Sequence, residues 1–316
     1  MFLNMDEEVV DYRLGDVKAF SELLSRMRQG WGFEAAQLAK AYDIMLEMIR
    51  DKECVKFLSL TANIVSTGLR GVIAEMIEKG LCNVVITTGG TFDHDIAKSM
   101  RKYYRGDFIM DDRSLKKRET HRLGNILIPQ SSYGLAIESF TISMLREITR
   151  EKKVFSSREL AEEVGKRLKD RNSIFRSAYE KKVPVYAPGI VDSAFGTQLF
   201  LFSQTNEFSL NLLKDMKELS DTVFSSRRTG ALILGGGISK HHTIWWNQFK
   251  GGLDYVVSLT TAYEFDGSLS GARLEEAITW NKVRENAAIA LVHVDVTLAL
   301  PLLLAAVYEK FSNHEI

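Results

Sequence analysis

The chain has 316 residues, of which 45% are hydrophobic and 26% are charged, so it can bury one large α/β core or two small ones. Its 41 basic and 41 acidic residues balance, which excludes a global field that would collect nucleic acid or an anionic membrane. Cys54 and Cys82 have neither metal-ligand spacing nor a disulfide framework, and we interpret them as core residues in a reducing compartment. The start MFLNMDEEVV is acidic, unlike a secretory signal. We therefore expect a soluble, cytoplasmic protein without a metal site.

Apolar residues recur with helical spacing over residues 15–50, among them Phe20, Leu24 and Leu38. This pattern predicts an N-terminal helical arm, residues 1–50. Only four prolines occur in the chain, and no proline-rich or Ser/Gly-rich linker interrupts the remainder. Residues 51–316 are therefore predicted to form one domain.

Beyond residue 50, short apolar strands alternate with helices. Strands are expected at residues 55–60, 83–88, 125–129, 183–188, 231–237, 254–261 and 288–295. Helices are expected at residues 67–79, after Asp93, and at residues 133–150, 158–170, 209–225 and 297–311. The alternation predicts an α/β fold: a single Rossmann-like, doubly wound, mostly parallel sheet with helices on both faces. The apolar run 287–308 resembles a membrane span, but His293, Asp295 and Pro301 interrupt it, so we interpret it as the last strand and helix.

Three of the predicted strands end in loops of small and polar residues. These loops carry Thr87, Thr88, Gly89 and Gly90; Gly235, Gly236 and Gly237; and Thr61, Asn63 and Ser66. Glycines let a phosphate or ribose approach backbone N–H groups at a helix N-terminus, and Asn, Ser and Thr add neutral donors. Three such loops at one sheet edge favour nucleotide binding, although none fits the G-x-G-x-x-G fingerprint and each alone is explained by a turn.

Carboxylates are expected near the same edge. Asp93 and Asp95 should lie in the first turn of the helix after Gly90, and Asp192 and Asp295 should follow two other strands. A carboxylate at such an edge commonly holds ribose hydroxyls. Capping of a helix N-terminus is an equally good interpretation of Asp192 and Asp295.

His241 and His242 follow the GGG loop at a predicted helix start. Residues four apart share a helix face, so His241 should pair with Trp245 and His242 with Trp246. One pair should face the site while the other packs. Histidine is the usual general base near neutral pH, whereas adjacent histidines diverge too much to hold a metal together.

The stretch DGSLSGARLEEAITWNKVR, residues 266–284, ends with Lys282, the candidate nucleophile. A lysine becomes a nucleophile when burial or a nearby cation destabilises its ammonium, and Trp280 would supply a dry wall. Glu276 and Trp280 are four residues apart, so on a helix a carboxylate and an indole would share one face and suit an organic cation. For Lys282 to join them, the helix must end near Trp280 or Asn281.

The motifs TANIVSTG, TTGGTFDHD, HRLGNILIP, PGIVDSAFG, LGGGISKHH, EFDGSLSGAR and EAITWNKVR occur in the order seen in the deoxyhypusine synthase family. The resemblance extends from Phe33 to about Leu304, and the WWNQF and TFDHD variants resemble the archaeal branch. It implies NAD-dependent transfer of the aminobutyl group of spermidine to one lysine of the hypusine-bearing translation initiation factor. It also implies a homotetramer in which active sites lie at a subunit interface.

The resemblance assigns roles by matching positions. Lys282 matches the lysine that captures the imine, and His241 matches the base. The implied NAD contacts are Asn63, Ser66, Thr88, Gly89, Asp93, Asp192, Gly236, Thr261, Asp266, Ser268, Ser270 and Asp295. The implied polyamine-binding positions are Glu276, Trp280, His94, Gly267 and Trp245.

Several positions depart from the eukaryotic pattern of the family. Thr197 and Leu269 stand where aspartates are expected, His94 occupies a glutamate position and Trp245 an asparagine position. Fewer carboxylates should weaken or alter recognition of a triply charged amine. Two alternatives stay open: a polyamine aminobutyltransferase of the homospermidine synthase type, and a non-catalytic NAD-binding protein that docks the factor. The joint presence of Lys282, His241, Glu276 and Trp280 argues against the non-catalytic alternative.

Overall fold

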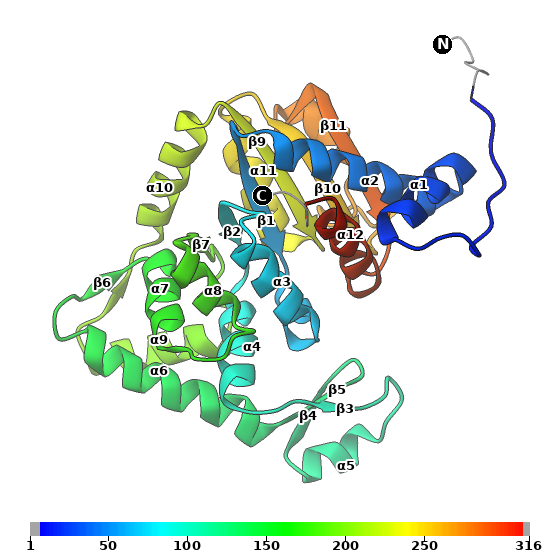
Figure 1. The fold of residues 1–316 in the computed structure, drawn as a ribbon. Coiled ribbons are helices and arrows are strands. Elements are labelled where there is room, and N and C mark those ends of the chain that lie inside the picture. Colours follow the sequence, from blue (N-terminus) through cyan, green and yellow to red (C-terminus); the bar gives the residue numbers. More distant parts are fainter. Residues whose placement is uncertain (1–6, 312–316) are drawn as a thin grey trace.

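The computed structural model describes residues 7–311, and Figure 1 shows their arrangement. The strands are β1 (Cys54–Leu60), β2 (Val84–Ile86), β3 (Tyr104–Arg105), β4 (Thr120–Leu123), β5 (Ile126–Pro129), β6 (Val154–Phe155), β7 (Val185–Tyr186), β8 (Ser209–Leu210), β9 (Arg228–Leu234), β10 (Leu253–Thr260) and β11 (Val283–His293). The α-helices are α1 (Phe20–Gly30), α2 (Phe33–Arg50), α3 (Leu69–Glu78), α4 (Gly89–Met100), α5 (Asp112–Lys117), α6 (Gly134–Ile148), α7 (Ser157–Arg167), α8 (Ile174–Lys181), α9 (Ala194–Ser203), α10 (Leu212–Ser225), α11 (Gly237–Gln248) and α12 (Val296–Phe311). Short 3-10 helices are η1 (Ala62–Ser66), η2 (Gln130–Ser132), η3 (Glu264–Asp266) and η4 (Glu276–Trp280).

The main sheet has six strands in the order β11-β10-β9-β1-β2-β7, and every neighbouring pair is parallel. From β1 the chain moves outward through β2 and β7, and it then returns to β9 and moves outward on the other side through β10 and β11. This is the doubly wound Rossmann order, which confirms the predicted fold class. The winding reverses between β1 and β9, so their carboxyl ends form the topological switch point.

Hydrophobic cores lie on both faces of this sheet because successive strand residues alternate between the faces. In β1, Phe57 belongs to a core built with α10 and α11, whereas Leu58 and Leu60 belong to a larger core built with α2, α3 and α12. Figure 1 shows α2, α3 and α12 together on one side of the sheet with α11 behind it. The prediction of helices on both faces is therefore confirmed, and both Cys54 and Cys82 lie in the larger core.

The N-terminal helices pack onto the sheet and onto the last helix. In α2, Ala39, Ala41 and Met45 are completely buried. The backbone N–H groups of Phe20 and Ser21, at the start of α1, both donate to the carboxylate of Glu309 on α12 at 2.9 Å. The division of the chain at residue 50 stays a prediction, and what the structure describes is a helix pair that contacts the sheet and α12.

Two local expectations are corrected. The run 125–129 forms β5, which pairs antiparallel with β3 and β4 in a separate small sheet and so adds no strand to the main sheet. Helix α4 begins at Gly89, which places Asp93 and Asp95 beyond its first turn. Pro301 lies inside α12 as its sixth residue, as the predicted helix 297–311 requires, and its missing N–H removes one backbone hydrogen bond.

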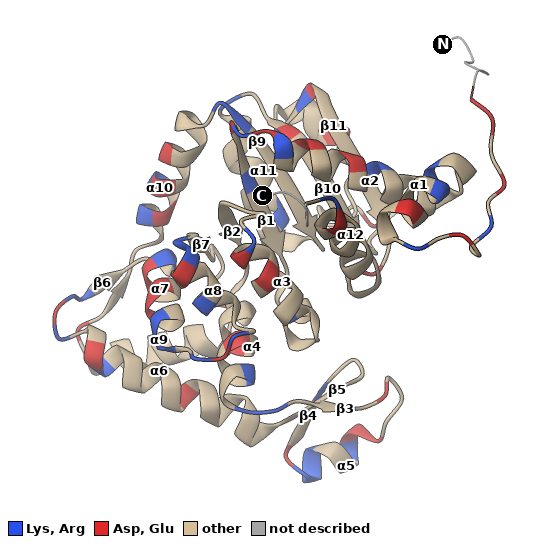
Figure 2. Ribbon diagram, viewed as in Figure 1, with Lys and Arg blue, Asp and Glu red and all other residues tan. Residues whose placement is uncertain are grey.

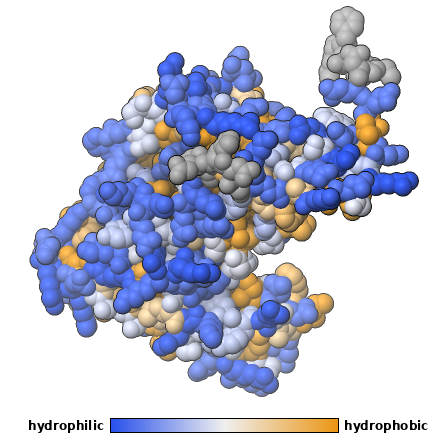
Figure 3. Space-filling model, in the orientation of Figure 1, coloured by the Kyte–Doolittle hydropathy of each residue, from blue (hydrophilic) through white to orange (hydrophobic). Residues whose placement is uncertain are grey.

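The small sheet and α5 form a lobe that stands away from the main body in Figure 1. Phe108 and Ile109 on this lobe are exposed, and Figure 3 shows hydrophobic residues on the lobe and a hollow between it and the body. Elsewhere, acidic and basic residues alternate over the helices (Figure 2), in keeping with the balanced net charge.

Candidate active site

Lys282 lies between η4 and β11, one residue after Asn281, the C-cap of η4, and directly before Val283. Asn281 ends the short helix with a left-handed backbone, φ 54°, so the chain turns sharply at this point. The N–H of Lys282 donates to Ala277 at 3.0 Å, and its carbonyl accepts from the N–H of Leu253 at 3.1 Å. The predicted helix end near Trp280 is confirmed, and Lys282 is held by the sheet rather than by a mobile loop.

The segment before Lys282 is a 3-10 helix, not the α-helix that the sequence pattern suggested. With three residues per turn, positions four apart are separated by about 120° around the axis. The shared face expected for Glu276 and Trp280 is therefore wrong in detail, although both side chains are exposed on the same five-residue helix.

The ammonium of Lys282 lies between two indole rings. Its Nζ is 5.2 Å from the ring centroid of Trp280 and 5.6 Å from that of Trp245, and the residue is 8% exposed. Among residues 7–311, no carboxylate forms an ion pair with it and no hydrogen bond of its Nζ is found. Aromatic walls accept a cation or an iminium while they exclude water.

His241 and His242 have different surroundings. The His241 ring stacks on Trp245 with centroids 5.4 Å apart, and the pKa of His241 is lowered by burial and then by the positive charge of Lys282. His242 accepts a hydrogen bond from the indole N–H of Trp246 at 3.2 Å, and burial lowers its pKa to about 4. One pair therefore lies beside Lys282 while Trp246 of the other pair packs in the core, and the role of His241 in a catalytic site stays a prediction.

The switch point between β1 and β9 has the shape that a phosphate-bearing cofactor requires. Gly235 adopts a positive φ of 86°, and a Cβ on Gly236 would come within 2.6 Å of Ser270 Cα. The N-cap residues of α4 and α11 make no side-chain cap; in α11 the first N–H, that of Gly237, donates to Ser270 Oγ instead, whereas the first N–H groups of α4 stay available at the carboxyl edge of the sheet. The residues present therefore fit a dinucleotide.

Several predicted cofactor residues surround this point. Thr61 donates to the side chain of Asn63 at 2.6 Å, and Ser66 donates to the Asn63 carbonyl at 2.6 Å, so η1 presents an ordered amide at the exit of β1. Thr88 is the residue before α4, and Gly89 packs so closely against the Ile190 carbonyl that a Cβ would come within 2.7 Å of it. The structure thus brings the exits of β1 and β2 together, beside β9.

The loop that contains Asp266, Gly267, Ser268 and Ser270 folds back onto the start of α11. Gly237 donates its N–H to Ser270 Oγ at 3.0 Å, and Asp266 accepts from the N–H of Ser268 at 2.6 Å. This contact joins the loop before η4 to the glycine loop after β9. The predicted cofactor and polyamine stretches are therefore neighbours in the fold.

Asp93 and His94 are engaged inside the protein. Asp93 is 2% exposed and accepts hydrogen bonds from the N–H groups of Ala194 and Phe195 and from the hydroxyl of Tyr133, although burial raises its pKa. His94 Nδ1 lies 3.0 Å from the hydroxyl of Tyr103, and burial lowers its pKa to about 4. Direct contact of Asp93 with a cofactor would require exchange of these bonds, and it stays a prediction.

Three further predicted residues lie at the carboxyl edge of the sheet. Asp192 is exposed, and Ser193, not Asp192, caps α9, so the capping interpretation of Asp192 is wrong. Asp295 accepts from the N–H of Thr297 at 2.7 Å at the start of α12 and thus forms a capping-type contact. Thr261 is exposed directly after β10.

The sequence did not reveal the role of Lys240, which precedes His241. Its side chain is 1% exposed and donates to the carbonyls of Ala272 at 2.9 Å and Ser270 at 3.3 Å. Burial lowers its pKa to about 8, opposed by the charge of Glu276. The only sequence signal for this role is a lysine about one helical turn after the glycine loop. That signal does not indicate which loop the lysine holds.

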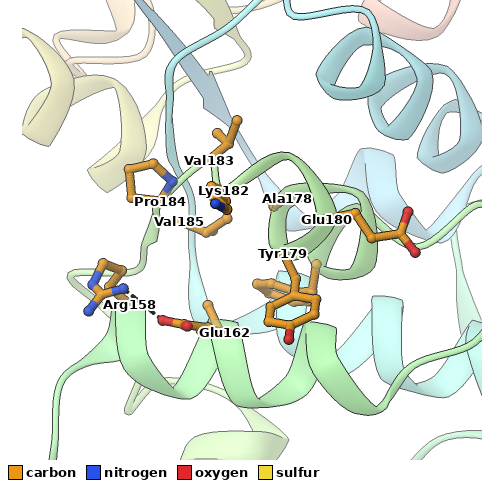
Figure 4. Close-up of a pocket in the computed structure, with 11 residues that line it drawn as sticks. Arg158, Glu162, Ala178, Tyr179, Glu180, Lys182, Val183, Pro184 and Val185 are labelled. Carbon is orange, nitrogen blue, oxygen red and sulfur yellow. Dashed lines mark hydrogen bonds and ion pairs between the residues drawn. The ribbon is translucent and has the colours of Figure 1, made fainter.

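A cavity of about 570 Å³ lies between α7, α8 and the start of β7 (Figure 4), at the amino end of the sheet. Its walls include Phe175, Tyr179 and Val183, with Arg158 and Glu162 at the rim. None of the predicted site residues lines it. Ligands of doubly wound sheets bind at the carboxyl ends of the strands, so we place the active site at the switch point and not in this cavity.

Together, the doubly wound parallel sheet and its glycine-rich switch point define a dinucleotide-fold protein that holds a buried lysine beside two indole rings. The sequence profile of the family "Deoxyhypusine synthase" matches residues 22–307. The chain is 50% identical over 301 residues to a probable deoxyhypusine synthase of Sulfurisphaera tokodaii, covering 95% of this chain and 96% of the relative. It is 51% identical over 299 residues to that of Sulfolobus acidocaldarius, covering 94% and 96%. The chain therefore belongs to the deoxyhypusine synthase family, and its function is that of a deoxyhypusine synthase.

The fold agrees with a crystal structure from Entamoeba histolytica that is provisionally assigned as a deoxyhypusine synthase. The TM-score is 0.64 at 18% identity, and 94% of this chain and 96% of the other are covered. Among residues 7–311, no helix has the length and apolar character needed to cross a membrane. The same residues contain no group of three or more His, Cys, Asp or Glu side chains arranged to hold a metal ion.

Proposed function

We propose that the chain transfers the aminobutyl group of spermidine, through an imine on Lys282, to one lysine of the hypusine-bearing translation initiation factor. The observation that supports this most is the position of Lys282, which lies between Trp245 and Trp280 and within electrostatic reach of His241. The assignment to the deoxyhypusine synthase family gives the reaction, and this geometry supports Lys282 and His241 as the residues that we propose perform it.

We propose NAD as the cofactor, held at the switch point by Asn63, Ser66, Thr88 and the N-termini of α4 and α11. When bound there, NAD supplies the acceptor for a hydride from the carbon beside the secondary nitrogen of spermidine and later returns that hydride. His241 is neutral near pH 7 because its pKa is lowered, so it can accept the proton that the amine loses.

The remaining steps belong to the chain's own residues. The amine of Lys282 attacks the substrate imine carbon, the three-carbon diamine leaves with the proton that Nζ loses, and the aminobutyl group is held as an imine on Nζ. The acceptor lysine of the factor then attacks the same carbon and releases Lys282. Trp245 and Trp280 exclude water from the enzyme imine and thus oppose its hydrolysis.

The residues around the expected amine site favour a site with few carboxylates. Leu269, at an expected aspartate position, packs against the core that contains Leu274 and Ala277. Thr197 bonds to the carbonyl of Ser193 at 2.9 Å. We therefore propose that the amine is held mainly by Glu276, Trp280 and Trp245. Gly267 has no side chain and would let the amine approach the backbone.

Two further proposals follow from the family. Trp280 is 62% exposed and Trp245 is 38% exposed, so the nucleophile lies beneath aromatic side chains that a second copy of the chain would cover in a homotetramer. The factor that accepts the aminobutyl group acts in translation, and we accordingly propose a cytoplasmic location.

Borohydride trapping tests the nucleophile. Wild-type protein incubated with NAD and spermidine labelled in the aminobutyl group should become labelled on reduction, because the imine is fixed as a secondary amine. Lys282→Ala and Lys282→Arg should not be labelled. The control is Lys250→Ala, which removes a lysine just beyond the C-terminal end of α11 and should be labelled like wild type. Label on Lys282→Ala would overturn the assignment.

A transfer assay with labelled spermidine, NAD and the cognate factor separates the three functions considered. Label on the factor supports the proposal. Label only in a small polyamine supports the homospermidine-type alternative, and binding of NAD and factor without transfer supports the non-catalytic alternative.

A further inference from the structure

Lys98, in the last turn of α4, extends its side chain toward the end of η1. Its Nζ donates to three consecutive backbone carbonyls, Val65 at 3.2 Å, Ser66 at 3.0 Å and Thr67. The preceding part of the same turn carries Asn63, whose amide is held at the exit of β1. Lys98 thus contacts one wall of the switch point without lying in it.

These carbonyls depend on Lys98. Val65 is completely buried and Ser66 is 3% exposed, and no other hydrogen bond to their carbonyls is found among residues 7–311. The helix that follows offers no replacement donor from its first residue, since the N–H of Leu69 donates to the hydroxyl of Thr67 at 3.0 Å. A buried carbonyl that loses its donor retains its full desolvation cost, so the turn would rearrange rather than stay in place.

The carboxylates near Lys98 are already engaged with another cation. Asp95 and Asp170 both pair with Arg70, at 2.5 Å and 2.7 Å, and Lys98 forms no ion pair of its own within the described part of the chain. The ring of Tyr103 lies 5.9 Å from its Nζ, and His94 is close enough for the charge of Lys98 to lower the pKa of His94. The ammonium is therefore directed to the turn rather than to an acid.

Lys98 also connects two of the loops that meet at the switch point. Helix α4 begins at Gly89, the exit of β2, and Lys98 near its other end holds η1, the exit of β1. We propose that Lys98 is a positioning residue that fixes the β1 exit relative to the N-terminus of α4 and thereby sets the affinity for the cofactor. This inference rests on the proposed use of NAD.

The proposal distinguishes binding from chemistry. Lys98 contacts neither Lys282 nor His241, so its loss should weaken NAD binding while the reaction at saturating NAD is preserved. A general loss of packing would instead lower kcat and the melting temperature together. The conservative change to arginine keeps a cation with several donors near the same carbonyls and should recover most of the affinity.

The test uses the full-length protein and isothermal titration with NAD. Lys98→Met should raise the Kd for NAD about tenfold or more, as expected when a buried acceptor loses its donor. Lys98→Arg should stay within about threefold of wild type. The matched control is Lys56→Met, because Lys56 also donates to a backbone carbonyl, Cys54 at 3.4 Å, but from the amino end of β1; its Kd should equal that of wild type.

Steady-state assays complete the test, with kcat at saturating NAD expected within about threefold of wild type for Lys98→Met. An unchanged Kd in Lys98→Met, or a kcat reduced as much as kcat/KM, overturns the inference alone. If Lys98→Met does not fold, Lys98→Gln replaces it as the test: its shorter, neutral side chain cannot serve all three carbonyls, so its Kd should also rise, and a wild-type Kd for it overturns the inference equally. Absence of NAD binding by wild type overturns the proposed cofactor and this inference together.

Discussion

Lys282 and Lys240 are both buried lysines near the 266–273 loop, and their partners differ completely. The ammonium of Lys240 donates hydrogen bonds to two backbone carbonyls of the loop and so holds the loop against α11. Lys282 faces two indole rings, and no acid in the described part of the chain pairs with it. A lysine that alternates between a free amine and an imine cannot keep strong hydrogen bonds on its nitrogen. A lysine that holds a loop in place must keep them.

Gly236 is the residue at which one added methyl group should disturb the cofactor site. Gly236→Ala would place a Cβ against Ser270 and push the loop away from α11, breaking the bond from the Gly237 N–H to Ser270. We expect the Kd for NAD to rise about tenfold or more, measured by titration calorimetry.

The control for this change is Gly189→Ala at the exit of β7, where the new Cβ would lie 3.4 Å from the side chain of Ile238 in ordinary contact. Its Kd should match that of wild type. Equal affinity in Gly236→Ala and wild type would show that the loop does not shape the cofactor site.

For single residues, the sequence predicts a role that depends on the spacing of nearby residues. It does not predict a role that depends on partners far away in the chain. The pairing of His241 with Trp245 follows from helical spacing and was predictable. Asp93 bonds to the N–H of Phe195, 102 residues later in the chain, and no local pattern contains that information. The roles of Lys98 and Lys240 were not predicted for the same reason, because each side chain lies on one element and holds a loop that belongs to another.

Among the elements, α3, α4 and α8 are joined by a buried charge cluster. Asp95 on α4 is completely buried and bonds to Arg70 on α3, to the hydroxyl of Ser173 and to the N–H of Phe175 on α8. Arg70 also pairs with Asp170. The cluster fixes the orientation of α4, whose first residue is at the switch point and whose last turn holds Lys98.

Asp95→Ala should lower the free energy of unfolding by about 3 kcal/mol, because it leaves part of the buried Arg70 guanidinium without a partner. Urea denaturation followed by circular dichroism measures this loss. The control is Asp221→Ala, which breaks the exposed Lys217–Asp221 pair on α10 and should cost less than about 0.5 kcal/mol. Equal small losses in both variants would contradict the assigned role of the cluster.

Two segments, residues 125–129 and 276–280, were predicted incorrectly, and they show what the periodicity of apolar residues does not determine. The run NILIP has the composition of a buried strand, but it pairs in the small antiparallel sheet, and strand composition alone does not specify a partner. Residues 276–280 have helical character in sequence, yet the tighter 3-10 form occurs because the chain must turn at Asn281 into β11. The main sheet was predictable because its strands are short, apolar and separated by helices.

For the whole molecule, the pH dependence of stability follows from two buried histidines. Burial lowers the pKa values of His94 and His242 to about 4, whereas each titrates near its ordinary value of 6.5 in the unfolded chain. Between these two pH values the unfolded state binds more protons than the folded state. Stability should therefore fall as the pH decreases from 6.5 toward 4, by at most about 1.4 kcal/mol per pH unit for each histidine.

Denaturation curves between pH 7 and pH 4.5 test this expectation. His242→Gln should show a shallower loss of stability than wild type, because one of the two histidines no longer titrates. His121→Gln, which alters an exposed histidine on β4, should follow the wild-type slope. Parallel slopes for wild type and His242→Gln would rule out His242 as a source of the acid sensitivity.

The strand order also has a consequence for synthesis on the ribosome. β1 pairs with β2 on one side and β9 on the other, and more than half of the chain lies between β1 and β9. The β1–β2–β7 half can assemble while the remainder is still being made, but one edge of β1 then stays open until β9 emerges. The cofactor edge is completed only after that pairing, so a nascent chain that stalls before β9 would present a bare, apolar strand edge for aggregation or chaperone capture.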